Sequence, residues 1–449
     1  MREERRLAAL AMAVTLASGL AASPARAAEH ERPALAGGAG SVEVALPPGT
    51  PLGGYGAFPR RAWAPDVLDR WPHAFWMRPA AGLRDPIRAR ALVLAAGEVR
   101  LLWLAVDLVG VDPSLLVDLR ARLARQGRGY TGLIVSASHT HSGPGAYSGS
   151  ELLGFVALDR LAPAVRASVL DALEAAAGTA AAAAGPAHVG WGRTEVDGVT
   201  RSRLRAPLDP EMLVLKVTRP DGAPVAAVWS YAIHGTMLGP RNALLSGDVM
   251  AAASLAIERR LGVPALFVNG AVGDVSPAGH GAAAMAQIGD RLAEGARRAW
   301  EAAKAQADHR LAVVVRRLRL PPPALRLRNC LGVAVPRALA IPVGDALPRA
   351  AEVVAARIGP GAVVTVPGEL ETRLGREIKA AGAGAFASVM VAGLSNDYVG
   401  YLLTREGYAR PSYVSCSSVY GARGGELARD AAGRALADLA GAAPARPGG

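Results

Sequence analysis

Hydrophobic and polar positions form a pattern that occurs three times along the chain. Each copy contains apolar segments that predict strands, then a segment with apolar residues at helical spacing, and then another apolar strand. In the first two copies the opening segments predict a hairpin, with the turns AGE and RPDG. The predicted helices are SLLVDLRARLARQG, MAAASLAIERRLG and ETRLGREIKAAG, and the strands after them are GLIVSAS, PALFVNG and ASVMVAG.

The order of these elements predicts how the strands are arranged. Two strands joined by a crossover helix in one sheet are almost always parallel, so their carboxyl ends lie at the same edge. We therefore predict an α/β fold with mixed, largely parallel β-sheets and flanking helices, built from repeated strand-helix-strand units. Ligands of such folds bind outside the carboxyl ends of the strands. The polar residues expected at this edge are Asp107, His139, His141, His234, Asp274, Ser276, Glu369, Asn396 and Tyr401.

Residues 1–27 have the features of a secretory signal peptide. The basic segment MREERR precedes an apolar stretch, and ASPARA ends in an A-x-A pattern before Ala28. The competing interpretation is a membrane anchor, but the apolar stretch is shorter than the roughly 20 residues that span a bilayer. We expect residues 28–449 to form a single exported domain, periplasmic or secreted, because no linker rich in Pro, Gly or Ser divides them.

Composition narrows the class of protein. With 51% apolar and 20% charged residues, the chain is expected to be globular. The net charge of +12 comes almost entirely from scattered arginines without a dense basic run, which argues against nucleic acid as a partner. The two cysteines, Cys330 and Cys416, could pair in an oxidising compartment, and their small number excludes a zinc site built on thiolates.

The strand ends carry residues suited to metal chemistry. His139 and His141 would point to one face of a continuing strand, although a pair of hydrogen-bonded core histidines explains this spacing equally well. His234 and Glu369 end two other predicted strands and supply imidazole and carboxylate groups, which suit zinc. Such a His, His, Glu set leaves one position for a water molecule, which zinc acidifies at neutral pH.

A rival interpretation concerns the segment GDVSP. Ser276 could be a nucleophile activated by a nearby histidine. The segment lacks the G-x-S-x-G pattern that would specifically indicate a nucleophilic serine. Hydrogen bonds of Asp274 and Ser276 that fix the loop explain both residues equally well, so catalytic and structural roles stay open.

Five motifs in order resemble the neutral/alkaline, non-lysosomal ceramidase family and cover most of residues 40–422. They are SASHTHSGPG, YAIHGTM with SGD, VGDVSP, VPGELETRLG and GLSNDYVGYLLTREGYARPSYVSCSSVYG. The resemblance implies one Zn²⁺ ion per chain and a ceramidase-like catalytic domain without the C-terminal immunoglobulin-like domain of longer family members. The zinc ligands that it implies are His139, His234, Glu369 and Tyr401.

The resemblance also implies catalytic roles. His141 would act on water at the metal, and Ser276 falls on a serine that the family needs, as nucleophile or as support. The residues expected to stabilise the oxyanion are Arg201, with Arg203 close to it, and Tyr413.

The implied function is a zinc-dependent amidohydrolase that cleaves ceramide or a related N-acyl lipid to a fatty acid and a sphingoid base. The alternatives are a serine esterase using Ser276 and a non-catalytic lipid-binding protein of the cell envelope. We expect a lipid-like N-acyl substrate and no obligate protein partner, and peripheral contact with a membrane stays open.

Overall fold

Three larger sheets, each with one pair of parallel strands, organise the chain. They are seen in a computed structural model that describes residues 35–336 and 338–442, so the predicted signal peptide lies outside the described residues. The described residues, from Leu35 onward, belong to one compact unit. In each larger sheet the second strand of a hairpin pairs in parallel with a strand that follows a helix. The chain thus has a mixed α/β fold.

The first sheet has the strand order β5-β4-β3-β1-β6. Its hairpin of β3 and β4 turns at Gly97, and the helix α2 leads from β4 to the parallel strand β5. The Asp112 carboxylate caps α2 by accepting hydrogen bonds from the backbone N–H groups of Ser114 and Leu115. The elements are β1 (Ala36–Glu43), β3 (Arg88–Ala96), β4 (Val99–Val106), α2 (Pro113–Arg125), β5 (Gly132–Ala137) and β6 (Gly185–Pro186).

The second sheet has the order β12-β10-β9-β7, and the third has the order β14-β17-β18-β20. The second comprises β7 (His188–Glu195), β9 (Glu211–Thr218), β10 (Pro224–Tyr231) and β12 (Ala265–Asn269), with α5 (Asp248–Leu261) joining β10 to β12. The third comprises β14 (Leu311–Arg319), β17 (Ala350–Ile358), β18 (Gly361–Thr365) and β20 (Val389–Ala392), with α8 (Thr372–Gly382) joining β18 to β20.

The expectation of largely parallel sheets is wrong. Each larger sheet contains one parallel pair, and its other neighbouring strands are antiparallel. Short turns join β3 to β4, β9 to β10 and β17 to β18, and a short turn places its two strands antiparallel. The other antiparallel neighbours are joined by longer connections. The strand β17 adds such a hairpin with β18, which the sequence pattern did not indicate. Within the three larger sheets, only the helical crossovers produce parallel neighbours.

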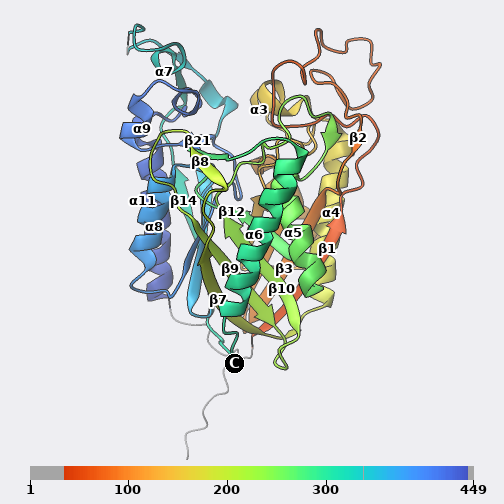
Figure 1. The fold of residues 1–449 in the computed structure, drawn as a ribbon, viewed down its shortest axis with the longest axis vertical. Helices are drawn as coiled ribbons and strands as arrows, with labels where there is room; N and C mark the ends of the chain where they lie inside the picture. Colours follow the sequence, from red (N-terminus) through yellow and green to blue (C-terminus); the bar gives the residue numbers. More distant parts are fainter. Residues whose placement is uncertain (1–34, 337, 443–449) are drawn as a thin grey trace, which may run out of the picture. The chain divides into compact units, whose positions relative to one another are not determined.

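The three larger sheets are buried on both faces. In β4, Leu102 and Leu104 belong to an apolar cluster that includes α2 and α4 (Pro163–Ala182). Alternate residues Leu101 and Trp103 point into a second cluster, to which strands of all three sheets contribute. The helices α5 and α6 (Ala282–Ala302) cover the second sheet, and α8 and α11 (Gly424–Gly441) cover the third. The helices therefore form an outer layer around strands that share a core (Figure 1).

Shorter elements extend beyond the carboxyl ends of the parallel strands. Four two-stranded pairs form, β2 with β11, β8 with β13, β15 with β16 and β19 with β21. Their bounds are β2 (Gly82–Leu83), β8 (Thr200–Ser202), β11 (Leu244–Leu245), β13 (Val275–Pro277), β15 (Ala324–Arg326), β16 (Ala340–Pro342), β19 (Glu369–Leu370) and β21 (Tyr401–Leu402). The short helices are α3 (Glu151–Leu153), η1 (Gly154–Leu158), α7 (Leu327–Leu331), η2 (Gly344–Ala346), α9 (Arg405–Ala409), α10 (Tyr413–Cys416) and η3 (Gly421–Arg423).

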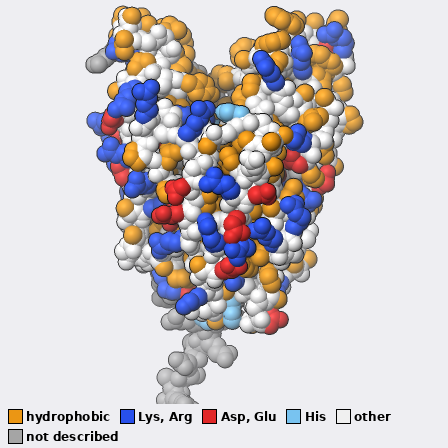
Figure 2. Space-filling view, in the orientation of Figure 1, with side chains coloured by type: hydrophobic (Ala, Val, Ile, Leu, Met, Phe, Trp, Pro, Cys, Tyr) orange, Lys and Arg blue, Asp and Glu red, His pale blue; other side chains and the backbone are white. Residues whose placement is uncertain are grey.

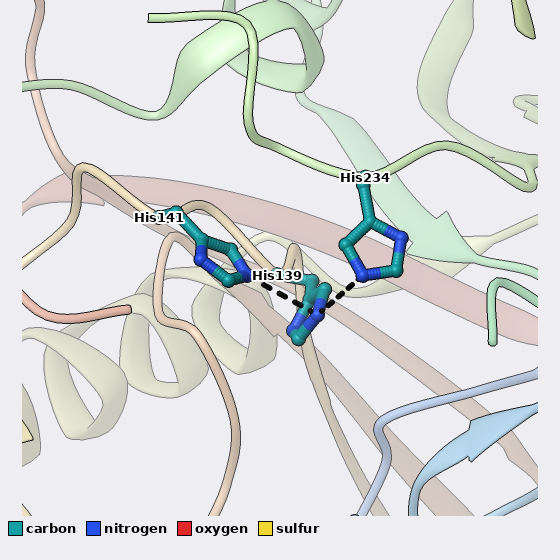
Figure 3. Close-up of side chains that lie close together, drawn as sticks. All are labelled: His139, His141 and His234. Carbon is teal, nitrogen blue, oxygen red and sulfur yellow. Dashed lines mark hydrogen bonds between the residues drawn. The ribbon is translucent and has the colours of Figure 1, made fainter. Parts of the chain in front are cut away.

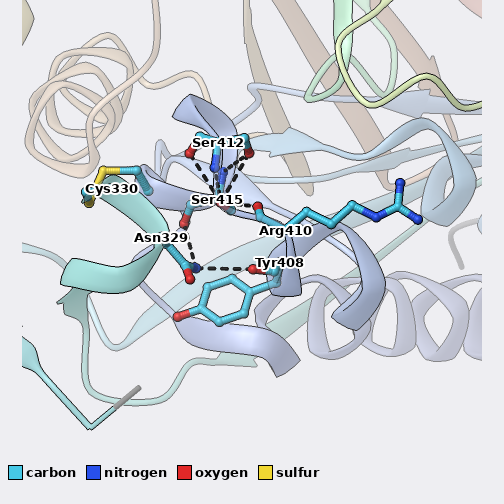
Figure 4. The surroundings of a disulfide bond; sticks show 7 residues. Asn329, Cys330, Tyr408, Arg410, Ser412 and Ser415 are labelled. Carbon is cyan, nitrogen blue, oxygen red and sulfur yellow. Dashed lines mark hydrogen bonds between the residues drawn. A yellow bond between two sulfur atoms is a disulfide. The ribbon is translucent and has the colours of Figure 1, made fainter. Parts of the chain in front are cut away.

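The two cysteines form a disulfide. Cys330 at the end of α7 is bonded to Cys416 at the end of α10, with their Cα atoms 4.6 Å apart. Beside it, the Asn329 side-chain amide donates hydrogen bonds to the carbonyl oxygens of Tyr408 and Ser415 (Figure 4). These bonds join α7 to the short helices α9 and α10. Among the described residues, no helix has both the length and the apolar character needed to cross a bilayer.

Candidate metal centre

His139 follows β5 by two residues and is held in an unusual backbone conformation. Its φ of 68° lies in the left-handed region, which non-glycine residues rarely adopt. The backbone N–H donates to the Leu108 carbonyl at 2.9 Å, and the ring Nδ1 lies 2.6 Å from the Val109 carbonyl oxygen. Because a carbonyl only accepts, Nδ1 carries a proton, which leaves Nε2 as the ring atom that can bind a metal. The backbone thus fixes the tautomer that binds a metal through Nε2.

His234 follows β10 by three residues and lies against the His139 loop. A side chain at Gly235 would place its Cβ 2.6 Å from the His139 carbonyl oxygen, so glycine permits the close approach. The Gly235 carbonyl also accepts from the backbone N–H of His141 at 2.8 Å. At the end of β12, the Asn269 amide donates to the carbonyls of Ser138 and Ile233 at 3.1 and 2.9 Å. One buried amide therefore links the residues that precede both histidines.

Glu369 completes a close group of buried side chains. Its Oε2 lies 3.3 Å from Nε2 of His139 and 3.0 Å from Nε2 of His234, and these two nitrogens are 3.2 Å apart. Nε2 of His141 is 3.4 Å from Nε2 of His139, and the three imidazoles converge (Figure 3). The strand-end residues His139, His234 and Glu369, far apart in the sequence, are thus brought together. The three histidines meet the geometry of a metal-binding group.

Two tyrosines contact this group from the segment after β20. Tyr398 donates its hydroxyl to Oε1 of Glu369 at 2.6 Å. Burial, together with the negative charge of Glu369, raises the pKa of Tyr398, so the hydroxyl keeps its proton. Tyr401 lies opposite Glu369 in the parallel pair of β19 and β21, and burial raises its pKa as well. Tyr398 was missed in the sequence, although it stands three residues before the tyrosine that was chosen.

His141 and His234 are electrically neutral at neutral pH. Burial lowers the pKa of His234 to about 3, and burial with the neighbouring His139 lowers the pKa of His141 well below its usual value. A neutral imidazole is the form that binds a metal or accepts a proton. His141 and His234 can therefore bind a metal or accept a proton at neutral pH.

Arg203, and not Arg201, contacts the group. Arg203 Nε donates to the Ser276 hydroxyl at 2.8 Å, and Nη1 donates to the Tyr401 hydroxyl at 2.9 Å. Arg201 is exposed, and its Nη2 lies 3.4 Å from Nε2 of His280. The backbone of Arg201 pairs with Ser276 in β8 and β13, and β8 ends before Arg203, so the chain turns and only the later side chain reaches inward. Arg201 therefore does not lie where the sequence prediction requires it.

Tyr413 lies at the edge of the group. It begins α10, is 71% exposed, and its ring centroid is 5.9 Å from that of Tyr401. Of the other residues expected at strand ends, Asp107 accepts from the Arg88 backbone and pairs with Arg90. Asp274 accepts from Thr372 at the start of α8. Asn396 bonds the backbone of β5. These three stabilise the loops and strands instead of entering the group.

Arg60 holds the loops that carry His141 and follow His234, a role that no pattern in the sequence indicated. Its guanidinium is buried and donates to the carbonyls of Gly53, His141, Gly239 and Pro240. Burial lowers the pKa of Arg60 to about 10, so it stays charged at neutral pH. The acceptors lie up to 180 positions away in the chain, which is why local patterns could not indicate this role.

A cavity of about 540 Å³ opens beside the group. His141, Glu369, Tyr398, Tyr401 and Tyr413 line its polar end. The other walls are mainly apolar and come from α3 and η1 on one side and from β15, β16 and η2 on the other. Figure 2 shows the surface hollowed between two projecting parts, which carry the α7 and α3 labels in Figure 1. The site thus combines a polar base with a cavity suited to an apolar chain.

Part of this chain is similar in sequence to known proteins. Residues 73–292 match the family described as neutral/alkaline non-lysosomal ceramidase, N-terminal. The neutral ceramidase of Mycobacterium tuberculosis is 29% identical over 204 residues, which cover 40% of this chain and 32% of that protein. The neutral ceramidase of Pseudomonas aeruginosa is 27% identical over 219 residues, covering 44% and 32%. The matched part therefore spans about a third of the length of these relatives.

The fold has a counterpart among solved structures. The crystal structure of neutral ceramidase from Pseudomonas aeruginosa superposes with a TM-score of 0.77, covering 92% of this chain and 76% of that chain. The identity over the superposed residues is 20%. At this identity the superposition shows that the folds are similar.

Proposed function

The chain belongs, through residues 73–292, to the neutral/alkaline non-lysosomal ceramidase family, and on this premise we propose that it is a zinc-dependent amidohydrolase. The bond cleaved would be the N-acyl linkage of ceramide or a related N-acyl lipid, giving a fatty acid and a sphingoid base. The domain prediction, residues 28–449 as one catalytic domain, forms part of the proposal.

The spacing of the ligand atoms carries the proposal. Ligands about 2.0–2.1 Å from a tetrahedral zinc ion lie about 3.3–3.4 Å from one another. Between His139, His234 and Glu369 the corresponding distances are 3.0, 3.2 and 3.3 Å. In addition, Oε2 of Glu369 is buried and has no hydrogen-bond partner among the described residues. A buried carboxylate oxygen beside two imidazoles is stabilised by a cation between them.

The residues around the group have roles that fit amide hydrolysis. Zinc, when bound, would polarise the scissile carbonyl and acidify a water molecule. Neutral His141 would accept a proton from the attacking water and return it to the leaving amine. Arg203 would stabilise the tetrahedral anion together with Tyr413, in the role that the sequence assigned to Arg201. Tyr401 would be the fourth ligand, and Arg203 orients its hydroxyl.

The pocket supports a lipid-like substrate. Its walls include Leu153, Val156, Leu325 and Ile341, which would remove an acyl chain from water. At the polar end, the amide of such a lipid would lie next to His141 and Glu369. This arrangement favours an N-acyl lipid over a small polar amide.

Export to the periplasm or the medium is part of the same proposal. The basic, apolar and A-x-A segments of residues 1–27 support it. The disulfide between Cys330 and Cys416 is compatible with an oxidising compartment. Mass spectrometry of the protein recovered from fractionated cells would identify the N-terminus, which we expect at Ala28.

Elemental analysis of the purified protein, with hydrolysis of a fluorescent ceramide in parallel, tests the function. We expect about one zinc ion per chain in the wild type and loss of both zinc and hydrolysis in His234→Ala. His188→Ala, which changes a histidine outside the group, is the matched control and should keep both. An active enzyme without zinc would exclude the metal mechanism and favour an esterase that uses Ser276. Zinc without hydrolysis of any N-acyl lipid would exclude the substrate class.

A further inference from the structure

Two segments beside the pocket expose large apolar side chains. The first rim segment, residues 55–84, exposes Phe58, Trp63, Val67, Leu68 and Leu83. The second rim segment, residues 324–343, exposes Leu331, Val333, Leu339 and Ile341. Trp63 is 86% exposed and Leu331 is 72% exposed, values unusual for side chains of this size. Soluble surfaces rarely gather so many apolar groups unless they bind a protein or a membrane.

Both rim segments adjoin the mouth of the pocket. The second contributes Leu325 and Ile341 to the pocket wall, and Ile341 is also exposed. In the first, the Arg61 guanidinium lies over the ring of Phe155, in the η1 segment that forms the opposite wall. The exposed apolar surface therefore continues into the apolar lining of the pocket. Both projecting parts carry orange side chains in Figure 2, among white and blue ones.

Exposed apolar residues are otherwise scarce in the described part of the chain. Outside the rim segments, three large exposed apolar side chains lie in or just after η1, which forms part of the pocket wall, and Tyr413 lies at the polar end of the pocket. The other large exposed apolar side chains are Val117 and Val315. Val117 lies in α2 and Val315 in β14, outside both rim segments. The clustering at the pocket mouth is thus a local property and not a general feature of the surface.

The charged residues of the two rim segments indicate which kind of partner surface these segments would bind. In the first rim segment Arg70, Arg78, Arg84 and Asp69 are exposed, whereas Arg60 is buried. The described residues of the second rim segment include Arg326 and Arg328 and no carboxylate. Arginine next to exposed Trp, Phe and Leu is the composition of interfacial membrane binding. A protein partner with an apolar interface would need no such excess of positive charge on both sides.

We propose that the two rim segments bind an anionic lipid bilayer and place the pocket mouth against it. The apolar side chains would enter the interfacial region, and the exposed Arg78, Arg84 and Arg326 would contact the headgroups. A lipid acyl chain could then pass from the bilayer into the pocket without crossing water. This last consequence rests on the proposed function, whereas binding to the bilayer does not.

Flotation with vesicles tests the proposal. The probes are vesicles of phosphatidylcholine with phosphatidylglycerol and vesicles of phosphatidylcholine alone. We expect the wild type to float with the anionic vesicles, less so at high salt, and to bind the neutral vesicles weakly. The Trp63→Ala, Leu68→Ala double variant and the Leu331→Ser, Val333→Ser double variant should each bind at least about tenfold more weakly, because two large apolar groups no longer leave water.

The matched control is the Val117→Ser, Val315→Ser double variant, which also removes two exposed apolar side chains and should bind like the wild type. Equal binding by the rim and control variants would overturn the proposal, as would wild-type protein that stays unbound at low salt. Self-association through the rim segments without vesicle binding would also overturn it and assign the surface to a second copy of the chain. Circular dichroism spectra identical to the wild type would show that the variants are folded.

His234→Ala separates this proposal from the proposed function. It should float with anionic vesicles as the wild type does, even though it cannot hydrolyse the lipid. Binding without hydrolysis by the wild type would support the bilayer surface and refute the amidohydrolase. Hydrolysis of a detergent-dispersed ceramide without vesicle binding would support the enzyme and refute the bilayer surface.

Discussion

The guanidinium of Arg203 donates a hydrogen bond to the hydroxyl of Ser276 across 2.8 Å. Among the described residues, Ser276 has no hydrogen bond to a histidine. A serine nucleophile needs a base within hydrogen-bond reach, and a guanidinium cannot accept a proton. The contact makes Ser276 a group that orients Arg203, which in turn contacts Tyr401.

Replacement of Arg203 should therefore harm turnover more than replacement of Ser276. We expect Arg203→Met to lower kcat about 100-fold or more, since a donor to the developing anion is lost. Ser276→Ala, which removes one supporting hydrogen bond, should cost about tenfold. Arg201→Met is the control with the same change two residues away and should leave kcat within about twofold. Steady-state kinetics would decide, and complete inactivity of Ser276→Ala with an active Arg203→Met would support the esterase.

Tyr398 should control metal affinity through Glu369. Tyr398→Phe removes the donor to Oε1, which leaves the carboxylate free to rotate, and partners of this kind typically affect metal affinity by about 10–100-fold. Tyr231→Phe is the control, because it also removes a buried hydroxyl, whose hydrogen bond goes to the Val196 carbonyl far from the histidines. Competition with a fluorescent zinc chelator measures the affinity. Equal affinity in the two variants would mean that Tyr398 has no influence on the ion.

Asp397 should make the protein less stable as the pH rises. Burial raises the pKa of Asp397 to about 7, well above the ordinary value of about 3.9 in the unfolded chain. The folded state thus holds this proton more tightly, so stability is fully present below pH 4 and declines as the pH rises to about 7. Asp397→Asn removes this dependence and should raise the free energy of unfolding by up to about 4 kcal/mol at pH 8, with no gain at pH 4.

Denaturant unfolding at several pH values measures this difference. Asp345→Asn, which changes a fully exposed aspartate, should give the same curve as the wild type throughout. A gain for Asp397→Asn that is independent of pH would contradict the proposed origin, because it would reflect packing and not the proton.

Removal of the metal should destabilise the fold. An ion held by residues from β5, β10 and β19 would stabilise the folded state by about 4 kcal/mol when free zinc is a thousandfold above its Kd. Dialysis against a chelator should therefore lower Tm, and added zinc should restore it. His234→Ala serves as the control, and its Tm should not respond to the chelator. A Tm that falls equally in both proteins would show that the chelator acts elsewhere.

The sequence could predict which residues meet, but not all of their contacts. His139, His234 and Glu369 were expected at one edge because helical crossovers bring strand ends together, and the structure places them within about 3.3 Å of one another. The roles of Arg203 and Arg60 depend on the course of loops after the strands end, where periodicity carries no information. The choice between Arg201 and Arg203 required the strand boundary at Ser202.

The hairpins explain why the prediction of largely parallel sheets is wrong. Apolar periodicity indicates a strand, yet it does not show to which neighbour the strand pairs. The hairpin partner β17 was absent from the sequence prediction, so the third sheet lacked its antiparallel member. Tyr398 illustrates a similar limit, because two tyrosines three residues apart are equivalent until the backbone turn between them is known.

The core shared by the three larger sheets also couples the site to the whole fold. Each sheet leads into a loop that supplies one of His139, His234 and Glu369, and each buries one face in the same apolar cluster. No sheet can detach without exposing that cluster and separating a ligand from the others. Unfolding should thus be a single cooperative event, in which activity and tertiary structure disappear at one temperature. Retained activity would then report the integrity of the entire domain.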